Sequence, residues 1–401
     1  MLDQITKAEL NTLEIIKLAF GASEADQDSV AAKFRDLSEN WSEIKSELAV
    51  QTIIGLPVDV VLKLDITDKE KEEYFYYVAR KVKKVYNILN AQKEVCDILK
   101  DIPFVIIKGG AASMYYPKPE YRQMGDIDII VHPEYCEQVI SLFNEKGYKQ
   151  GKDNDRHIDF RTKFGIVIEL HRFFSTKEDG KHSIIFNQML YDAVSNREIT
   201  EMCGYHFPVL PKLENGMILL AHIRQHLHSG LGLRQIIDWM MYVKTNLNDE
   251  YWNGTFCKVS ENMELKILAE TVTLLCKEYL GLDGISWCDG ADKELVDEML
   301  YYIMEKGNFG RKQDKKSNDT IFVMHHFRNP ISAFKYLTEG GMRHWKAAQK
   351  YKVLKPFAWI YQIGRLLRMG LARKKGINTF VGEIKQSKSE VEFLRRLGVM
   401  D

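Results

Sequence analysis

The strongest constraint on the fold is the way the hydrophobic pattern changes along the chain. Between residues 69 and 100, apolar side chains recur at spacings of three, four or seven, which places them on one face of a helix. From Pro103 onward, short apolar runs typical of strands follow: 103–107 (PFVII), 126–131 (DIDIIV), 157–161 (HIDFR) and 165–170 (GIVIEL). From about residue 214 the helical period returns. The pattern predicts an α+β fold in which helical regions flank a small mixed β-sheet.

The same pattern divides the chain into four parts. We expect an N-terminal helical region over 1–100, a sheet-containing core over 101–212, a helical domain over 213–310 and a basic, aromatic helical region over 320–401. The polar segment 311–319 (RKQDKKSND) before the last part is typical of a linker or exposed loop. A chain of 401 residues is long enough for two or three domains.

Composition and charge point to no particular partner. The 56 Lys and Arg residues balance the 56 Asp and Glu residues. Any basic surface must therefore come from an uneven distribution of charged residues. The six cysteines form no C-x-x-C pair, which argues against a zinc ribbon and fits a reducing compartment. No apolar run reaches the length of a membrane span, and the first residues lack the apolar core of a signal peptide. We expect a cytoplasmic protein, with peripheral association at the membrane as a further option.

Two carboxylates stand side by side in one expected strand. Asp126 and Asp128 flank Ile127, and residues i and i+2 of a strand project from the same face. Like charges this close repel and raise each other's pKa, whereas a divalent cation removes the conflict because hard cations prefer oxygen ligands. Glu169 is an isolated acid in another apolar run. We predict that Asp126, Asp128 and Glu169 are the catalytic and metal-binding residues.

A phosphate-binding turn is expected just upstream. Lys108, Gly109 and Gly110 end the first apolar run, and two glycines before a helix let backbone N–H groups approach a phosphate closely. Lys108 is either a group that neutralises triphosphate charge or a side chain that extends to solvent.

Two further residues are candidates for contact with the nucleotide. Arg122 lies four residues before Asp126 and is placed to reach an anion near the metal. His171 shares the expected face of Glu169 by strand alternation, and both a role near the nucleotide and a structural role are open. A phosphate-binding turn, a metal pair and a third acid suffice for phosphoryl chemistry, in which two ions hold the attacking and leaving oxygens.

The order of these residues resembles the nucleotidyltransferase superfamily that includes DNA polymerase β and the aminoglycoside nucleotidyltransferases. That superfamily shows a glycine-rich turn, a D-x-D or D-x-E strand end and a later lone strand acid. The sequence is most similar to a branch of poorly characterised bacterial nucleotidyltransferases, and the resemblance covers about 101–240. The matching residues are Lys108-Gly109, Arg122, Asp126-Ile127-Asp128, Gly147-Tyr148 and Glu169-Leu170-His171.

The resemblance implies transfer of a nucleoside monophosphate from a nucleoside triphosphate, with ATP as the first choice, to a hydroxyl acceptor. The acceptor is a small molecule, a sugar or a protein, the leaving group is pyrophosphate, and the metal is Mg²⁺ with Mn²⁺ as the alternative. Two other interpretations stay open, namely a non-catalytic nucleotide-binding or antitoxin-like module and an RNA terminal nucleotidyltransferase. The core lacks the dense basic strip that the RNA enzyme would need.

Three histidines lie near one another after the core. His222 and His226 are four residues apart on an expected helix, and His228 follows. Two histidines at this spacing can share a metal, but no H-E-x-x-H motif accompanies them. We expect them to be polar residues of a helix that faces the active-site cleft or the surface.

The segment 343–375 is strongly basic. It holds ten Lys or Arg and no acid, with aromatic residues interleaved. Such a segment can bind an anionic membrane or an RNA surface. The default interpretation is a helical tail that packs its aromatic residues on the body and exposes its charges to water.

Overall fold

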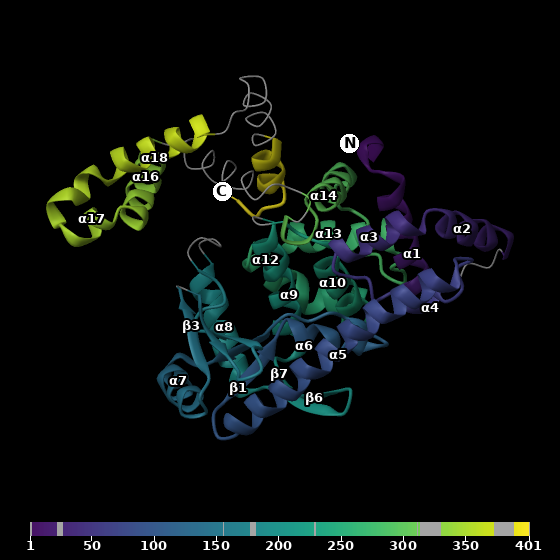
Figure 1. The fold of residues 1–401 in the computed structure, drawn as a ribbon, viewed down its shortest axis with the longest axis horizontal. Helices are drawn as coiled ribbons and strands as arrows, with labels where there is room; N and C mark the ends of the chain where they lie inside the picture. Colours follow the sequence, from purple (N-terminus) through teal and green to yellow (C-terminus); the bar gives the residue numbers. More distant parts are fainter. Residues whose placement is uncertain are drawn as a thin grey trace. The chain divides into compact units, whose positions relative to one another are not determined.

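The computed structural model describes residues 2–21, 27–154, 156–176, 182–227, 230–310, 312, 330–372 and 389–400 (Figure 1). It divides into two compact units, Met1–Lys312 with Leu397–Asp401, and Gln313–Arg396. The predicted α+β class with a mixed sheet is confirmed. The division into four parts stays a prediction, and of the expected linker 311–319 only Lys312 lies within the described residues.

The first unit contains a seven-stranded mixed sheet in the order β3-β4-β5-β2-β1-β7-β6. The strands are β1 (Phe104–Ile107), β2 (Ile127–Val131), β3 (Lys149–Asp153), β4 (His157–Arg161), β5 (Val167–His171), β6 (Glu198–Met202) and β7 (Tyr205–Val209). Strand β2 runs antiparallel to β1 and parallel to β5, while β1 runs parallel to β7. Strands β4 and β5, which coincide with the expected runs 157–161 and 165–170, pair antiparallel.

Helices surround this sheet and fill the rest of the first unit. Before the sheet lie α1 (Lys7–Phe20), α2 (Gln27–Glu39), α3 (Trp41–Val50), α4 (Val58–Val61) and α5 (Asp68–Ile98). Between the strands lie α6 (Gly109–Ser113), α7 (Cys136–Glu145) and α8 (Ser183–Ser195). After the sheet follow α9 (Lys212–His226), α10 (Leu233–Asn246), α11 (Asp249–Tyr251), α12 (Cys257–Asn262), α13 (Lys266–Leu280) and α14 (Lys293–Lys306).

Local chemistry sets the helix ends. The long helix α5 begins after Thr67, whose hydroxyl accepts the backbone N–H of Glu70 while the Glu70 carboxylate accepts the N–H of Thr67. Helices α2 and α3 are separated at Asn40. Asn40 donates its side-chain amide to Asp36, and this local hydrogen bond competes with helix continuation.

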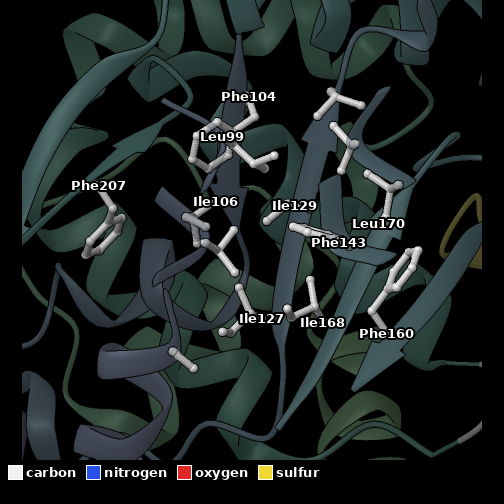
Figure 2. Packing of buried hydrophobic residues seen from close by; sticks show 14 of the residues in the cluster. Leu99, Phe104, Ile106, Ile127, Ile129, Phe143, Phe160, Ile168, Leu170 and Phe207 are labelled. Carbon is white, nitrogen blue, oxygen red and sulfur yellow. The ribbon is translucent and has the colours of Figure 1, made fainter. Parts of the chain in front are cut away.

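One face of the sheet packs against α5 and α7 and forms the apolar core. Alternate residues of the strands contribute to it, as Figure 2 shows for Ile127, Ile129 and Ile168 near Phe143 of α7. Because side chains alternate across a strand, the residues between them project from the other face. That face receives Asp128 and Glu169, so the sheet itself separates the acids from the core.

The second unit contains a helical hairpin of α16 (Pro330–His344), α17 (Lys346–Lys350), the 3-10 helix η7 (Lys352–Phe357) and α18 (Ala358–Ala372) (Figure 1). The helices approach closely, because a Cβ on Gly341 would lie only 1.8 Å from the carbonyl oxygen of Ala358. Trp345 stacks on Tyr361 with ring centroids 5.1 Å apart. Among the described residues, no helix is long and apolar enough to cross a membrane.

The packing of α9 on α10 yields a stability prediction. A Cβ on Gly216 would meet the fully buried ring of Tyr242 at 2.4 Å. We expect Gly216→Ala to lower the free energy of unfolding by about 1–3 kcal/mol through overpacking, measured by urea denaturation of the full chain. Gly254→Ala is the matched control, because no atom lies within 4 Å of its added Cβ. Equal denaturation midpoints for the two variants would contradict this packing.

Candidate active site

The three predicted carboxylates meet on the face of the sheet opposite the apolar core. Asp128 of β2 lies directly across from Glu169 of β5 in parallel register, and Asp126 immediately precedes β2. One carboxylate oxygen from each residue lies within 4.8 Å of the others. The structure therefore brings together residues that the sequence separates by more than forty positions, in an arrangement that a divalent ion can bridge.

The electrostatics of this cluster are unequal. Burial, and then the charges of Asp128 and Glu169, raise the pKa of Asp126 to about 6. Burial also disfavours the charged form of Asp128, but the Lys108 ammonium and His171 hold its pKa well below the usual range. Asp128 therefore keeps its negative charge beside a carboxylate whose charged form is disfavoured, with one ammonium nearby, a setting in which additional positive charge is stabilising.

Lys108 supplies that ammonium from the turn after β1. Its φ of 52° is seldom adopted by residues other than glycine, and it directs the chain from β1 into α6. The Nζ atom lies 2.7 Å from Oδ1 of Asp128 and 3.5 Å from Nε2 of His171. Burial would lower the pKa of Lys108, but Asp128 and Glu169 raise it above its ordinary value. The side chain therefore points into the acid cluster, and its predicted contact with a triphosphate stays a prediction.

The predicted His171 is a neighbour of the same carboxylate. Its Nε2 lies 2.8 Å from Oδ1 of Asp128 and 3.5 Å from Oε2 of Glu169, and the imidazole is buried. His157 of β4 lies beside it, with Nδ1 3.7 Å from Glu169 and Nε2 3.2 Å from Asp159. In this arrangement His171 orients Asp128, and a direct contact with nucleotide stays a prediction.

The two predicted glycines have different environments. Gly109 lines the cavity beside the acids, where its backbone can approach a ligand. Gly110 is not among the lining residues, and a Cβ there would lie 2.9 Å from Oε1 of Gln92. Close packing of α6 against α5 is therefore a sufficient reason for glycine at position 110.

Arg122 is held by a partner that the sequence did not indicate. Its Nε donates to Oδ1 of Asp238 at 2.9 Å and its Nη2 donates to Oδ2 at 2.5 Å. The Tyr116 hydroxyl donates to the same carboxylate at 2.8 Å, and all three side chains are buried. Arg122 lines the cavity but uses two donors to link the sheet region to α10, so its contact with an anionic ligand stays a prediction.

Helices α9 and α10 add residues to the cavity. His222 and His226 line it, and their Nε2 atoms lie 2.9 Å apart. Burial lowers the pKa of both, so both are neutral near pH 7. They lie on a helix that faces the cleft, one of the two options expected, while His228 lies outside the described residues.

Arg234 is the cavity residue that sequence reasoning missed. It is the second residue of α10, and its Nη1 donates to the carbonyl oxygen of Gln123 at 3.3 Å. Burial and the neighbouring Arg122 charge lower its pKa to about 10, so it remains a cation at neutral pH. One signal in the sequence was its position four residues before Asp238, the spacing of neighbours on a helix.

The cavity has a volume of about 160 Å³ and a highly polar wall. It combines carboxylates, cations, imidazoles and glycine backbone: Lys108, Gly109, Arg122, Gly125, Asp126, Asp128, Glu169, His222, His226 and Arg234. An apolar ligand could offer these polar groups neither hydrogen bonds nor ion pairs in place of the water that it displaces. The wall suits a ligand with phosphate groups and a metal.

A protein-family model described as an uncharacterised nucleotidyltransferase matches residues 47–281, more than half of the chain. The chain belongs to this family. It is an enzyme of the nucleotidyltransferase class, and the resemblance predicted from the order of its residues is confirmed. The matched region covers the sheet and the helices from α4 to α13.

Two solved structures are similar over about half of the chain. The antibiotic-resistance factor ANT(2'')-Ia is 12% identical, with a TM-score of 0.30, over 46% of this chain and 94% of its own. An antigenic nucleotidyltransferase-like protein from Paracoccidioides brasiliensis is 13% identical, with a TM-score of 0.32, over 52% of this chain and 96% of its own. A comparison with the curated proteins finds no match.

The Arg122–Asp238 pair yields the second prediction. Asp238→Ala leaves a buried guanidinium without its carboxylate, and we expect the free energy of unfolding to fall by about 3–5 kcal/mol. Asp97→Ala is the control, because the Lys93–Asp97 pair has side chains that are 63% and 66% exposed and contributes about 0–1 kcal/mol. Denaturant titration of both variants checks this, and a loss in Asp238→Ala no greater than in the control would contradict it.

Proposed function

We propose that this enzyme transfers a nucleoside monophosphate from a nucleoside triphosphate, with ATP as the first choice, to a hydroxyl acceptor. The acceptor is a small molecule, a sugar or a protein, and pyrophosphate is released. The observation that carries the proposal is the convergence of Asp126, Asp128 and Glu169 in a cavity that Arg234 also lines.

The donor set fits Mg²⁺, with Mn²⁺ as the alternative. Three carboxylates offer the oxygen ligands that these hard cations prefer. Burial, and then the charges of Asp128 and Glu169, raise the pKa of Asp126, and a bound cation would stabilise its charged form. In the proposed reaction Asp126 and Asp128 would hold both ions, and Glu169 would contribute a third carboxylate to one of them. Bound ions neutralise the charge that develops on the attacking and leaving oxygens.

The protein's own groups position the reactants. Lys108 and His171 both contact Oδ1 of Asp128, which fixes the orientation of that carboxylate. Glu169 is only partly buried, so its carboxylate is accessible from the cavity and can accept the proton of the acceptor hydroxyl. The backbone of Gly109 and the side chains of Lys108 and Arg234 are the groups proposed to contact the phosphates.

Cysteine chemistry supports the expectation of a cytoplasmic enzyme. All six cysteines are free, and each lies within the described residues. Thiols persist in reducing compartments, whereas secreted proteins generally oxidise them.

The decisive experiment identifies the product. The protein is incubated with each labelled triphosphate, Mg²⁺ and a cell extract, and the labelled species is isolated. Label on a small molecule, a sugar or a protein supports the proposal, and label confined to RNA 3′ ends would favour the terminal transferase. Triphosphate binding without any pyrophosphate release would contradict nucleotidyl transfer.

The acids are tested by isosteric substitution. We expect Asp126→Asn and Glu169→Gln each to lower the rate of nucleotide transfer by at least about 100- to 1000-fold, the loss that follows removal of one preorganised electrostatic contact. Stability of the metal-free protein should not fall in Asp126→Asn, because like-charge repulsion is relieved. Glu198→Gln, on the exposed part of β6, is the control. Normal turnover in either test variant would exclude the mechanism.

Arg234 is tested through substrate affinity. Arg234→Met keeps much of the side-chain volume but removes the cation, and we expect the KM for the triphosphate to rise about 10- to 100-fold, as for a lost charge-assisted hydrogen bond. Arg197→Met, at an exposed position before β6, is the matched control. Steady-state kinetics distinguish the two, and an unchanged KM in Arg234→Met would remove Arg234 from the phosphate site.

A further inference from the structure

The turn of the C-terminal hairpin exposes large apolar side chains. Tyr351, Val353 and Phe357 are 56%, 81% and 52% exposed, and Ile360 at the start of α18 is 49% exposed. All four lie within ten residues that span η7 and the residues on either side of it. Several large exposed apolar side chains in so short a segment indicate an interaction site.

Cations accompany the apolar side chains on the same short segment. Lys346, Lys350 and Lys355 are exposed. No acid occurs in the sequence between Glu339 and Glu383, so the whole turn carries positive charge without local compensation. The partner of this surface is therefore anionic.

The interior of the hairpin is already filled. Gly341 packs against Ala358, Gln362 is buried, and Trp345 stacks on Tyr361. The apolar side chains of the turn are additional to this packing. Within this unit Tyr351 and Phe357 are exposed, whereas Trp345 packs on Tyr361. The default interpretation, in which the aromatic residues of 343–375 pack on the body, stays a prediction.

We propose that the turn between α16 and α18 binds the surface of an anionic membrane. Its apolar side chains enter the boundary between headgroups and acyl chains, and its lysines contact the anionic headgroups while their alkyl stems follow the apolar layer. None of the described helices would cross the bilayer in this arrangement.

A lipid surface explains the aliphatic residues better than RNA does. Single-stranded RNA is bound by aromatic stacking and by cations, to which Val353 and Ile360 contribute nothing. In the acyl boundary the same two side chains gain free energy by leaving water. This inference stands independently of the proposed nucleotidyl transfer, because it concerns a different unit of the chain.

The test is co-sedimentation of the full chain, without nucleotide, with vesicles of phosphatidylcholine alone or mixed with phosphatidylserine. Binding is expected only to the mixed vesicles and is expected to weaken as salt is added. Lys350→Ala and Lys355→Ala should each weaken binding about fivefold. The double substitution of Val353→Ser and Phe357→Ser should weaken it at least about tenfold without changing the charge.

Matched controls come from the first unit. Ile199→Ser removes an aliphatic side chain that is 67% exposed on β6, and Lys293→Ala removes a lysine that is 77% exposed at the start of α14. Neither control should alter vesicle binding. Failure of the full chain to bind mixed vesicles, or equal binding by test and control variants, would overturn the proposal. Salt-sensitive binding to single-stranded RNA without vesicle binding would assign the surface to RNA instead.

Discussion

The active-site cavity depends on the register between two parallel strands. Asp128 of β2 lies across from Glu169 of β5, while their neighbours Ile127, Ile129 and Ile168 enter the apolar core. A slip of one residue would turn Glu169 into that core and an isoleucine toward the cavity. The same strand register therefore buries the isoleucines and brings the acids together. Because burial of the isoleucines stabilises that register, it also fixes the positions of the acids.

Nearby cations stabilise the carboxylates that converge in the cavity. Lys108 contacts Asp128 from a strained turn, and Arg122 is neutralised by Asp238 of α10. The cations come from two sides of the cavity wall, the turn after β1 and the helices that follow the sheet. Arg234 is the cation that α10 adds to the cavity wall, and its contact with phosphate is part of the proposed function. The helical region after the sheet is thus part of the site and not merely a support for it.

Much of the secondary structure was predictable where burial of one face makes apolar residues recur at a fixed spacing. The long amphipathic helix α5 and the strands β1, β2, β4 and β5 follow patterns of apolar spacing that only one secondary structure satisfies. Strands β3, β6 and β7 were not predicted. Strands β3 and β6 lie at the two edges of the sheet and are mostly exposed, so no apolar alternation marks them. The break at Asn40 depends on a local hydrogen bond rather than on hydrophobic period.

The sequence by itself determined the identity and order of the acids, the turn that precedes them and the family to which they belong. These features are local, since each is encoded within one strand or one turn. Only the tertiary structure decided which cations and imidazoles reach the acids. Arg122 and Asp238 are 116 positions apart, and Gly110 is constrained by a glutamine on another helix. Such contacts depend on how the helices pack against the sheet. The spacing of apolar residues along the chain does not predict that packing.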